Sequence, residues 1–182
     1  MNAIARPQMV PMPSAKGHRW AVAGIGSFIA VALLGRYGFN AQGVVYAFLA
    51  VVLVLISAID LERRIIPNRI VLPALAVVLV AQLAFHPEHA LEWILASVGA
   101  GLFFLIPLLV YPSGLGLGDV KLAMLLGAAL GMAVIGALLI GLLAGAAAAI
   151  VILAREGFAG RKTAIAFGPF LAFGALFTIL FL

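Results

Sequence analysis

The chain has 182 residues, of which 66% are hydrophobic and only 9% are charged, and its mean hydropathy is +1.28. A soluble globular domain carries roughly 25% charged residues, so this composition indicates an integral membrane protein instead. The absence of cysteine excludes disulfides, thiolate zinc sites and cysteine nucleophiles. The net charge of +5 comes from short basic clusters beside apolar runs, which indicates topology signals and no nucleic-acid partner.

The predicted elements follow a polar N-terminal stretch. Residues 1–19 hold three prolines and no apolar periodicity, so we expect a flexible cytoplasmic tail, with residues 20–182 as one transmembrane domain. Four apolar runs come next, each close to the ~20 residues that a helix needs to cross the hydrocarbon core. They cover residues 20–35, 43–59, 69–85 and 91–111.

The longest apolar stretch, residues 120–154, is too long for one straight crossing. As a single helix it would measure about 52 Å, well beyond a core of about 30 Å. A hairpin that turns at residues 130–132, followed by a last helix over 164–182, gives about seven transmembrane helices with a cytoplasmic N-terminus. Ten of the 11 lysines and arginines then lie inside and only Arg36 outside, which a single crossing would not achieve. The predicted fold class is therefore all-α, a polytopic membrane helix bundle.

Two aspartates stand at the ends of predicted helices on the same membrane face. Asp60 closes the second apolar run, and Asp119 opens the fifth after a glycine-rich loop. A carboxylate near the hydrocarbon is costly, so such residues face a water-filled cavity or another polar group. Two carboxylates a few Å apart share a proton, so one can accept a proton from an attacking water while the other donates to a peptide carbonyl.

The residues around Asp119 fit this hypothesis. Gly116 and Gly118 leave the backbone open to an extended substrate, and the start of a helix interacts favourably with a carboxylate. Lys121 would tune the charge of Asp119 or anchor the loop. From these residues alone three interpretations stay open: paired catalysis, proton or ion transport by the aspartates, and a structural role in which Asp60 pairs with arginines and Asp119 caps a helix.

Three short motifs follow one another along the apolar body. They are Ile59-Asp60 with Ile66-Pro67-Asn68, then Gly116-Leu-Gly118-Asp119-Val-Lys121, then Phe167-Gly168-Pro169-Phe170. In this order they resemble the motifs of the type IV prepilin peptidases. These are membrane aspartic endopeptidases of the GxGD class, to which presenilin and the signal peptide peptidases are similar. The resemblance covers residues 43–182.

The resemblance implies that Asp60 and Asp119 are the catalytic pair. They would remove the basic leader from prepilins at the cytoplasmic face of the bacterial inner membrane, with the hydrophobic helix of the prepilin and membrane lipids as further partners. The segment Gly168, Pro169 and Phe170 is expected either to contact the substrate or the active site, or to form a structural kink in the last helix.

Two features depart from the family pattern. Larger members carry an N-terminal region whose paired cysteines bind zinc, and they N-methylate the new terminus with S-adenosylmethionine. The short, cysteine-free tail here resembles the peptidases of tight-adherence (Flp) pilus systems, so we predict no metal, no cofactor and no methyltransferase activity. Ala166 also stands where many members have proline. The oligomeric state does not follow from the sequence.

Other groups of residues in the sequence indicate a metal site or helix packing less strongly. The loop His86-Pro-Glu-His89, with Glu92, offers metal-ligand types, but an exposed interfacial loop is the favoured interpretation. Gly127-xxx-Gly131 and Gly141-xxx-Gly145 are typical of close helix packing, which we expect within the chain.

The main rival function is a small proton- or ion-coupled transporter that uses Asp60 and Asp119 as carriers. The lack of an internal repeat counts against a transporter, and an inactive assembly factor is the third possibility.

Overall fold

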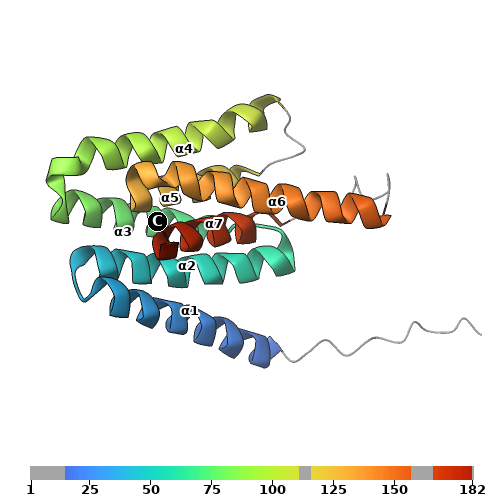
Figure 1. The fold of residues 1–182 in the computed structure, drawn as a ribbon, viewed down its shortest axis with the longest axis horizontal. Coiled ribbons are helices and arrows are strands. Elements are labelled where there is room, and N and C mark those ends of the chain that lie inside the picture. Colours follow the sequence, from blue (N-terminus) through green and yellow to red (C-terminus); the bar gives the residue numbers. More distant parts are fainter. Residues whose placement is uncertain (1–14, 111–115, 157–165, 182) are drawn as a thin grey trace, which may run out of the picture.

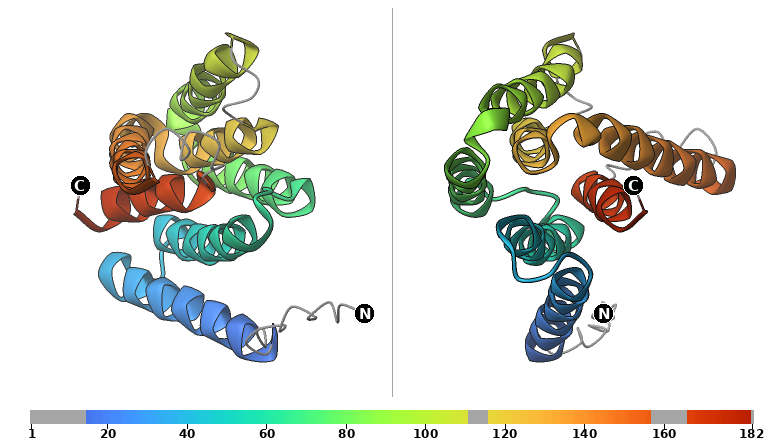
Figure 2. Two further views of the ribbon diagram at one scale, coloured as in Figure 1. Left: turned by 90° about the vertical axis from the view of Figure 1, so that its right-hand side faces the viewer. Right: turned by 60° about the vertical axis from the view of Figure 1, so that its left-hand side comes forward.

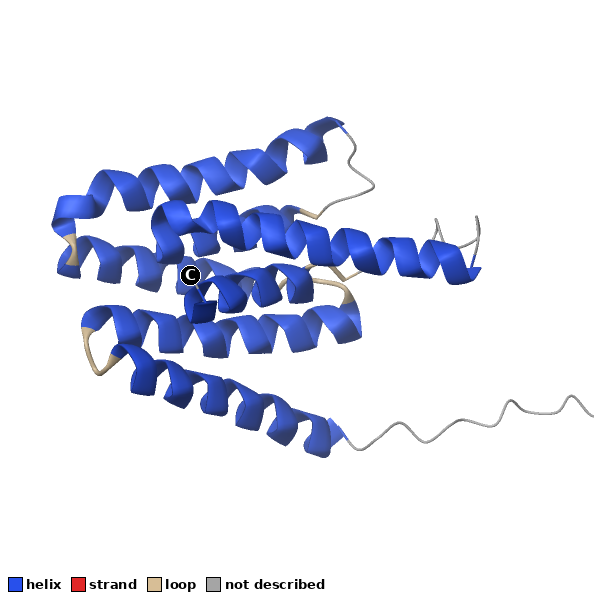
Figure 3. Ribbon diagram, viewed as in Figure 1, coloured by secondary structure: helices blue, strands red, loops and turns tan. Residues whose placement is uncertain are grey.

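The described part of the chain is all helical, as the sequence predicts. The computed structural model describes residues 15–110, 116–156 and 166–181. Within these ranges it contains seven α-helices and two short 3₁₀ helices, and no strand (Figure 1, Figure 3). The elements are α1 (Ala15–Tyr37), α2 (Ala41–Arg63), α3 (Asn68–Phe85), η1 (Pro87–His89), α4 (Ala90–Val110), α5 (Leu117–Leu130), η2 (Gly131–Ala133), α6 (Val134–Glu156) and α7 (Gly168–Phe181).

Among the described residues, five segments are long and apolar enough to cross a membrane, so the protein is a multi-pass membrane protein. They are Trp20–Tyr37, Ala41–Arg63, Asn68–Phe85, Pro87–Val110 and Leu117–Arg155. The apolar helix α7 is shorter, with 14 residues. The count of seven crossings and the cytoplasmic N-terminus stay predictions.

The first and the last helix start furthest from the sequence-based boundaries. The first helix begins at Ala15, so residues 15–19, which were assigned to the tail, belong to a helix, while residues 1–14 lie outside the described part. The last helix begins at Gly168 and not at residue 164. Apolar runs mark the part of a helix inside the hydrocarbon, and a helix can extend beyond that part into polar sequence.

The helix break inside residues 117–155 lies where the reversal was predicted. There α5 ends at Leu130, and Gly131 follows with a φ of +57°, in the left-handed region that favours glycine. Glu92 of α4 accepts a hydrogen bond from the N–H of Met132 at 3.1 Å, which satisfies a donor at the break. Figure 1 shows the chain turning back here, so that α5 and α6 run toward opposite ends of the picture.

The helix α5 forms the centre of the bundle. Nine of its 14 residues are buried, and it packs on α3, α4 and α7. On the other side, α2 lies between α1 and the pair formed by α3 and α7, while α1, α4 and α6 lie at the periphery (Figure 2). Both α3 and α7 pack on α2 and on α5, the two helices that carry the aspartates.

The two glycine patterns lie at contacts between helices of the same chain, as predicted. A Cβ at Gly127 of α5 would lie 2.7 Å from the Cα of Ser97 in α4, and a Cβ at Gly141 of α6 would lie 2.9 Å from the carbonyl oxygen of Phe170 in α7. Ordinary contacts are longer, so only glycine permits these approaches. The hydroxyl of Ser97 also donates to the carbonyl oxygen of Met124 at 3.0 Å and ties α4 to α5.

Candidate active site

Asp60 lies in the last turn of α2 with its side chain held by another helix. The residue is only 5% exposed, and its Oδ2 accepts a hydrogen bond at 2.9 Å from the backbone N–H of Gly168. Gly168 is the first residue of α7, and the first N–H groups of a helix have no partner within it. The N-terminus of α7 therefore supplies both a free donor and a favourable dipole to the buried carboxylate.

The close approach of α7 to Asp60 depends on glycine. A Cβ at position 168 would lie 2.9 Å from Oδ2 of Asp60 and 3.4 Å from its Cγ. Pro169 follows within the first turn, where its missing N–H breaks no helical bond. Gly168 and Pro169 thus begin α7 and do not form a kink inside it. Phe170 packs against the ring of Phe167, with centroids 6.4 Å apart.

Asp119 lies in the first turn of α5 and is held by its own loop. Its Oδ2 accepts a hydrogen bond from the N–H of Gly116 at 3.0 Å, and its own N–H donates to the carbonyl oxygen of Gly116 at 3.0 Å. Asp119 thus supplies the side-chain half of a capping box, while its own N–H bonds to the backbone carbonyl because Gly116 has no side chain. The carboxylate is half-buried and fixed by the backbone of the motif that contains it.

The structure brings the two aspartates together at one end of the bundle. The C-terminal end of α2 and the N-terminal ends of α5 and α7 meet there (Figure 1, Figure 2). Ile66, which follows Asp60 after the end of α2, lies against Gly118, the residue before Asp119. In each, Oδ2 is bound by a backbone N–H group, which fixes the position of a carboxylate without neutralising it. Such a pair is suited to acid–base chemistry on a water molecule.

The other predicted support residues contact the connection between α2 and α3. Gly118 lies against Ile66, because a Cβ at Gly118 would be 2.7 Å from the Cβ of Ile66. The ammonium of Lys121 donates to Oδ1 of Asn68 at 2.8 Å. In the described part of the chain, Lys121 forms no ion pair with either aspartate. Lys121 therefore supports the loop through Asn68, a residue to which the sequence assigned no role.

The loop with metal-ligand types lies elsewhere. The ring Nδ1 of His86 lies 3.5 Å from a carboxylate oxygen of Glu88, and that of His89 lies 3.5 Å from one of Glu92. Across residues 15–110, 116–156 and 166–181, no three histidine, aspartate or glutamate side chains are grouped so as to hold a metal ion.

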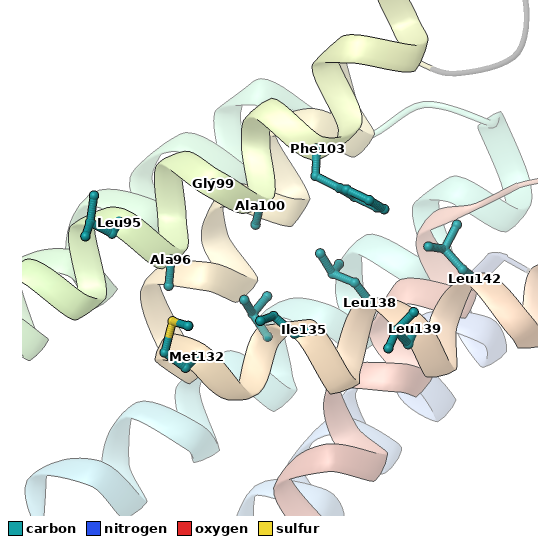
Figure 4. A pocket seen from close by; sticks show the side chains of 11 residues that line it. Leu95, Ala96, Gly99, Ala100, Phe103, Met132, Ile135, Leu138, Leu139 and Leu142 are labelled. Carbon is teal, nitrogen blue, oxygen red and sulfur yellow. The ribbon is translucent and has the colours of Figure 1, made fainter.

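An apolar cavity of about 450 Å³ lies between α4 and α6 (Figure 4). Phe103 of α4 and Leu138 and Leu142 of α6 line it together with other apolar residues. Because its lining carries no titratable side chain, this cavity lacks the groups that acid–base catalysis requires. This cavity is therefore no candidate for acid–base chemistry, unlike the end of the bundle that holds the aspartates.

Fold and site together define a class: a polytopic helical membrane protein with two carboxylates fixed at one end of the bundle. Residues 47–153, which include both aspartates, match the type IV leader peptidase family. The chain belongs to that family. No solved structure matches it significantly.

A curated relative is the "Prepilin leader peptidase/N-methyltransferase" of Xanthomonas campestris pv. campestris. It is 34% identical over 152 residues, which cover 80% of this chain and 53% of the relative. The chain thus spans about half the length of the curated relative it matches.

Proposed function

We propose that the protein is an aspartic endopeptidase that removes the leader peptide from type IV prepilins, with Asp60 and Asp119 as its catalytic residues. The observation that carries the proposal is that these two carboxylates lie at the same end of the bundle, each fixed by a backbone N–H group. Membership of the type IV leader peptidase family supports the substrate class.

The proposed reaction uses one water molecule between the carboxylates. The ionised carboxylate accepts a proton from the water as its oxygen attacks the scissile carbonyl carbon, and the protonated carboxylate donates to the carbonyl oxygen. When the tetrahedral intermediate collapses, the C–N bond breaks and the leaving amine takes up a proton from the pair. A hydroxyl of the intermediate returns one proton to the pair as the new carboxyl group forms. Because the two groups titrate together, the shared proton belongs to the pair and not to a single residue.

The proposed substrate is oriented by its charge. The positive-inside distribution favours a cytoplasmic position for both aspartates in the inner membrane. The basic leader would then lie in the cytoplasm, while the hydrophobic helix of the prepilin lies in the bilayer. Arg63, Arg64 and Arg69 are exposed beside the site, and their charge suits anionic lipid headgroups rather than a basic leader. The same proposal includes a prepilin of the Flp type as the substrate, and cleavage without methylation of the new N-terminus.

The test is cleavage of a co-expressed prepilin by membranes that contain Asp60→Asn or Asp119→Asn. Asparagine keeps the size of the side chain but cannot accept or deliver the proton, so we expect each variant to lose about 10³-fold or more in rate. Glu88→Gln is the matched control, because it removes an exposed carboxylate elsewhere and should leave cleavage unchanged. Persistent cleavage by Asp119→Asn would refute the assignment. Proton flux without cleavage, abolished by both variants, would favour the transporter.

A further inference from the structure

The hydrogen bond between Lys121 and Asn68 connects the two segments that carry the aspartates. Lys121 shares the N-terminal part of α5 with Asp119, and Asn68 opens α3 just after the connection that follows Asp60. The distance of 2.8 Å between Nζ and Oδ1 is that of a well-formed hydrogen bond. Because the donor is an ammonium, such a bond is roughly twice as strong as one between neutral groups.

A second contact joins the same two segments. Ile66 lies directly on the backbone of Gly118, where a Cβ would be 3.5 Å from the carbonyl oxygen of Ile66 and closer still to its side chain. The apolar contact is made by Gly118, just before Asp119, and the hydrogen bond is made by Lys121, two residues after it. Together they hold the first turns of α5 against the connection between α2 and α3.

The connection itself is fixed relative to Asp60. The N–H of Arg64 donates to the carbonyl oxygen of Asp60 at 2.8 Å, and Arg64 adopts a left-handed conformation with a φ of 54°. Pro67, whose ring restricts the backbone, accepts the first hydrogen bonds of α3 from the N–H groups of Ile70 and Val71. A displacement of Asn68 is therefore passed to the end of α2.

Direct contact between α2 and α5 is small, whereas α3 packs on both. Because α7 also packs on both helices, two elements set the separation of Asp60 from Asp119. Of these, α3 is the one that a side-chain hydrogen bond joins to α5, two residues from Asp119. In a reaction in which two carboxylates act on one water, a displacement of about 1 Å costs on the order of 100-fold in rate.

We infer that Asn68 and Lys121 are positioning residues, whose hydrogen bond sets the separation of the two aspartates without touching the substrate. The inference rests on the proposed function. It gives Lys121 a structural target, the side-chain oxygen of Asn68, and it gives Asn68 a role in the reaction.

A double-mutant cycle tests the inference in membranes with a prepilin substrate. Lys121→Met keeps most of the side-chain length and removes the donor, and Asn68→Ala removes the acceptor. Each should lower kcat about tenfold with KM changed by less than about twofold, and the double variant should be no slower than the slower single variant. Asn68→Asp keeps an acceptor for the ammonium and should retain most of the activity.

The controls separate positioning from other roles. Arg69→Met removes a neighbouring exposed cation and should leave kcat unchanged. Losses that multiply in the double variant would overturn the inference. So would a rise in KM at constant kcat, which would indicate substrate contact, or an Asn68→Asp variant as slow as Asn68→Ala.

Hydrogen exchange provides a readout that does not require cleavage. Backbone amides within residues 117–130 should exchange faster in Lys121→Met and Asn68→Ala than in the unmodified chain or in Arg69→Met, because the start of α5 loses its tie to α3. Unchanged exchange would overturn the inference whether or not a prepilin is cut. Faster exchange in a chain that cuts no prepilin would refute the proposed function and leave the structural link intact.

Discussion

At the scale of single residues, the site is built from carboxylates and backbone N–H groups. Gly168 donates to Asp60 and Gly116 donates to Asp119, each at the beginning of a helix. A helix N-terminus presents donors without internal partners, so it can hold a carboxylate without a cationic side chain beside it. This arrangement leaves both carboxylates free of ion pairs in the described part of the chain.

The variant Gly168→Ala should slow cleavage while the protein still folds. The new Cβ would lie 2.9 Å from Oδ2 of Asp60, so the carboxylate or the start of α7 must move. We expect kcat to fall on the order of 100-fold because the pair is misaligned. Gly99→Ala in α4 is the matched control, since a Cβ there would meet no atom within 4 Å. Full activity of Gly168→Ala would show that the contact with Asp60 is not required.

The residue types and motifs predicted that both aspartates lie at the same end of the bundle. They did not predict the backbone N–H groups that bind the two carboxylates. Asp60 and Gly168 are far apart in the chain, and every helix start offers similar N–H groups, so nothing local marks this donor. Asn68 follows a proline at the start of a helix, where a polar residue is ordinary. Its partner emerges only when α3 packs against α5.

At the scale of elements, the contact between α4 and α5 depends on Gly127. The backbone of Ala96 and Ser97 lies where a side chain at Gly127 would stand. The same interface contains the hydrogen bond from Ser97 to α5. Small residues allow such approaches between helices in a membrane, where apolar side chains gain little by leaving lipid.

Gly127→Val should therefore destabilise the bundle by about 2–3 kcal/mol through overpacking. The measurement is the free energy of unfolding in detergent or bicelles, or the midpoint of thermal unfolding. Gly99→Val, on an exposed position of α4, should leave stability nearly unchanged. Equal stability of the two variants would contradict the assignment of Gly127 to a tight helix contact.

The helix break at residues 130–132 could be predicted because length and charge both required it. A straight helix over 120–154 exceeds the bilayer, and a reversal keeps basic residues on one side. Helix ends were less predictable. The start of α1 at Ala15 lies in polar sequence, and hydropathy defines the extent of an apolar run and not the last hydrogen-bonded turn.

At the scale of the whole molecule, the topology predicts which loops face the same side of the membrane. The chain has no cysteine, so single-cysteine variants give unambiguous labelling. With a membrane-impermeant thiol reagent, Phe39→Cys and Glu88→Cys should react in intact cells, whereas Arg63→Cys and Arg155→Cys should react only after permeabilisation. Reaction of Arg155→Cys in intact cells would make residues 117–155 a single crossing.

The backbone N–H donors at Asp60 and Asp119 determine how this end of the bundle responds to ionic strength. A peptide N–H carries no net charge, so added salt has little effect on the hydrogen bonds that hold the two carboxylates. The exposed arginines beside them attract anionic surfaces through full charges, and that attraction weakens as salt is added. Raising the salt concentration should therefore loosen the attachment of this end of the bundle to lipid headgroups while leaving the geometry of the carboxylate pair as it is.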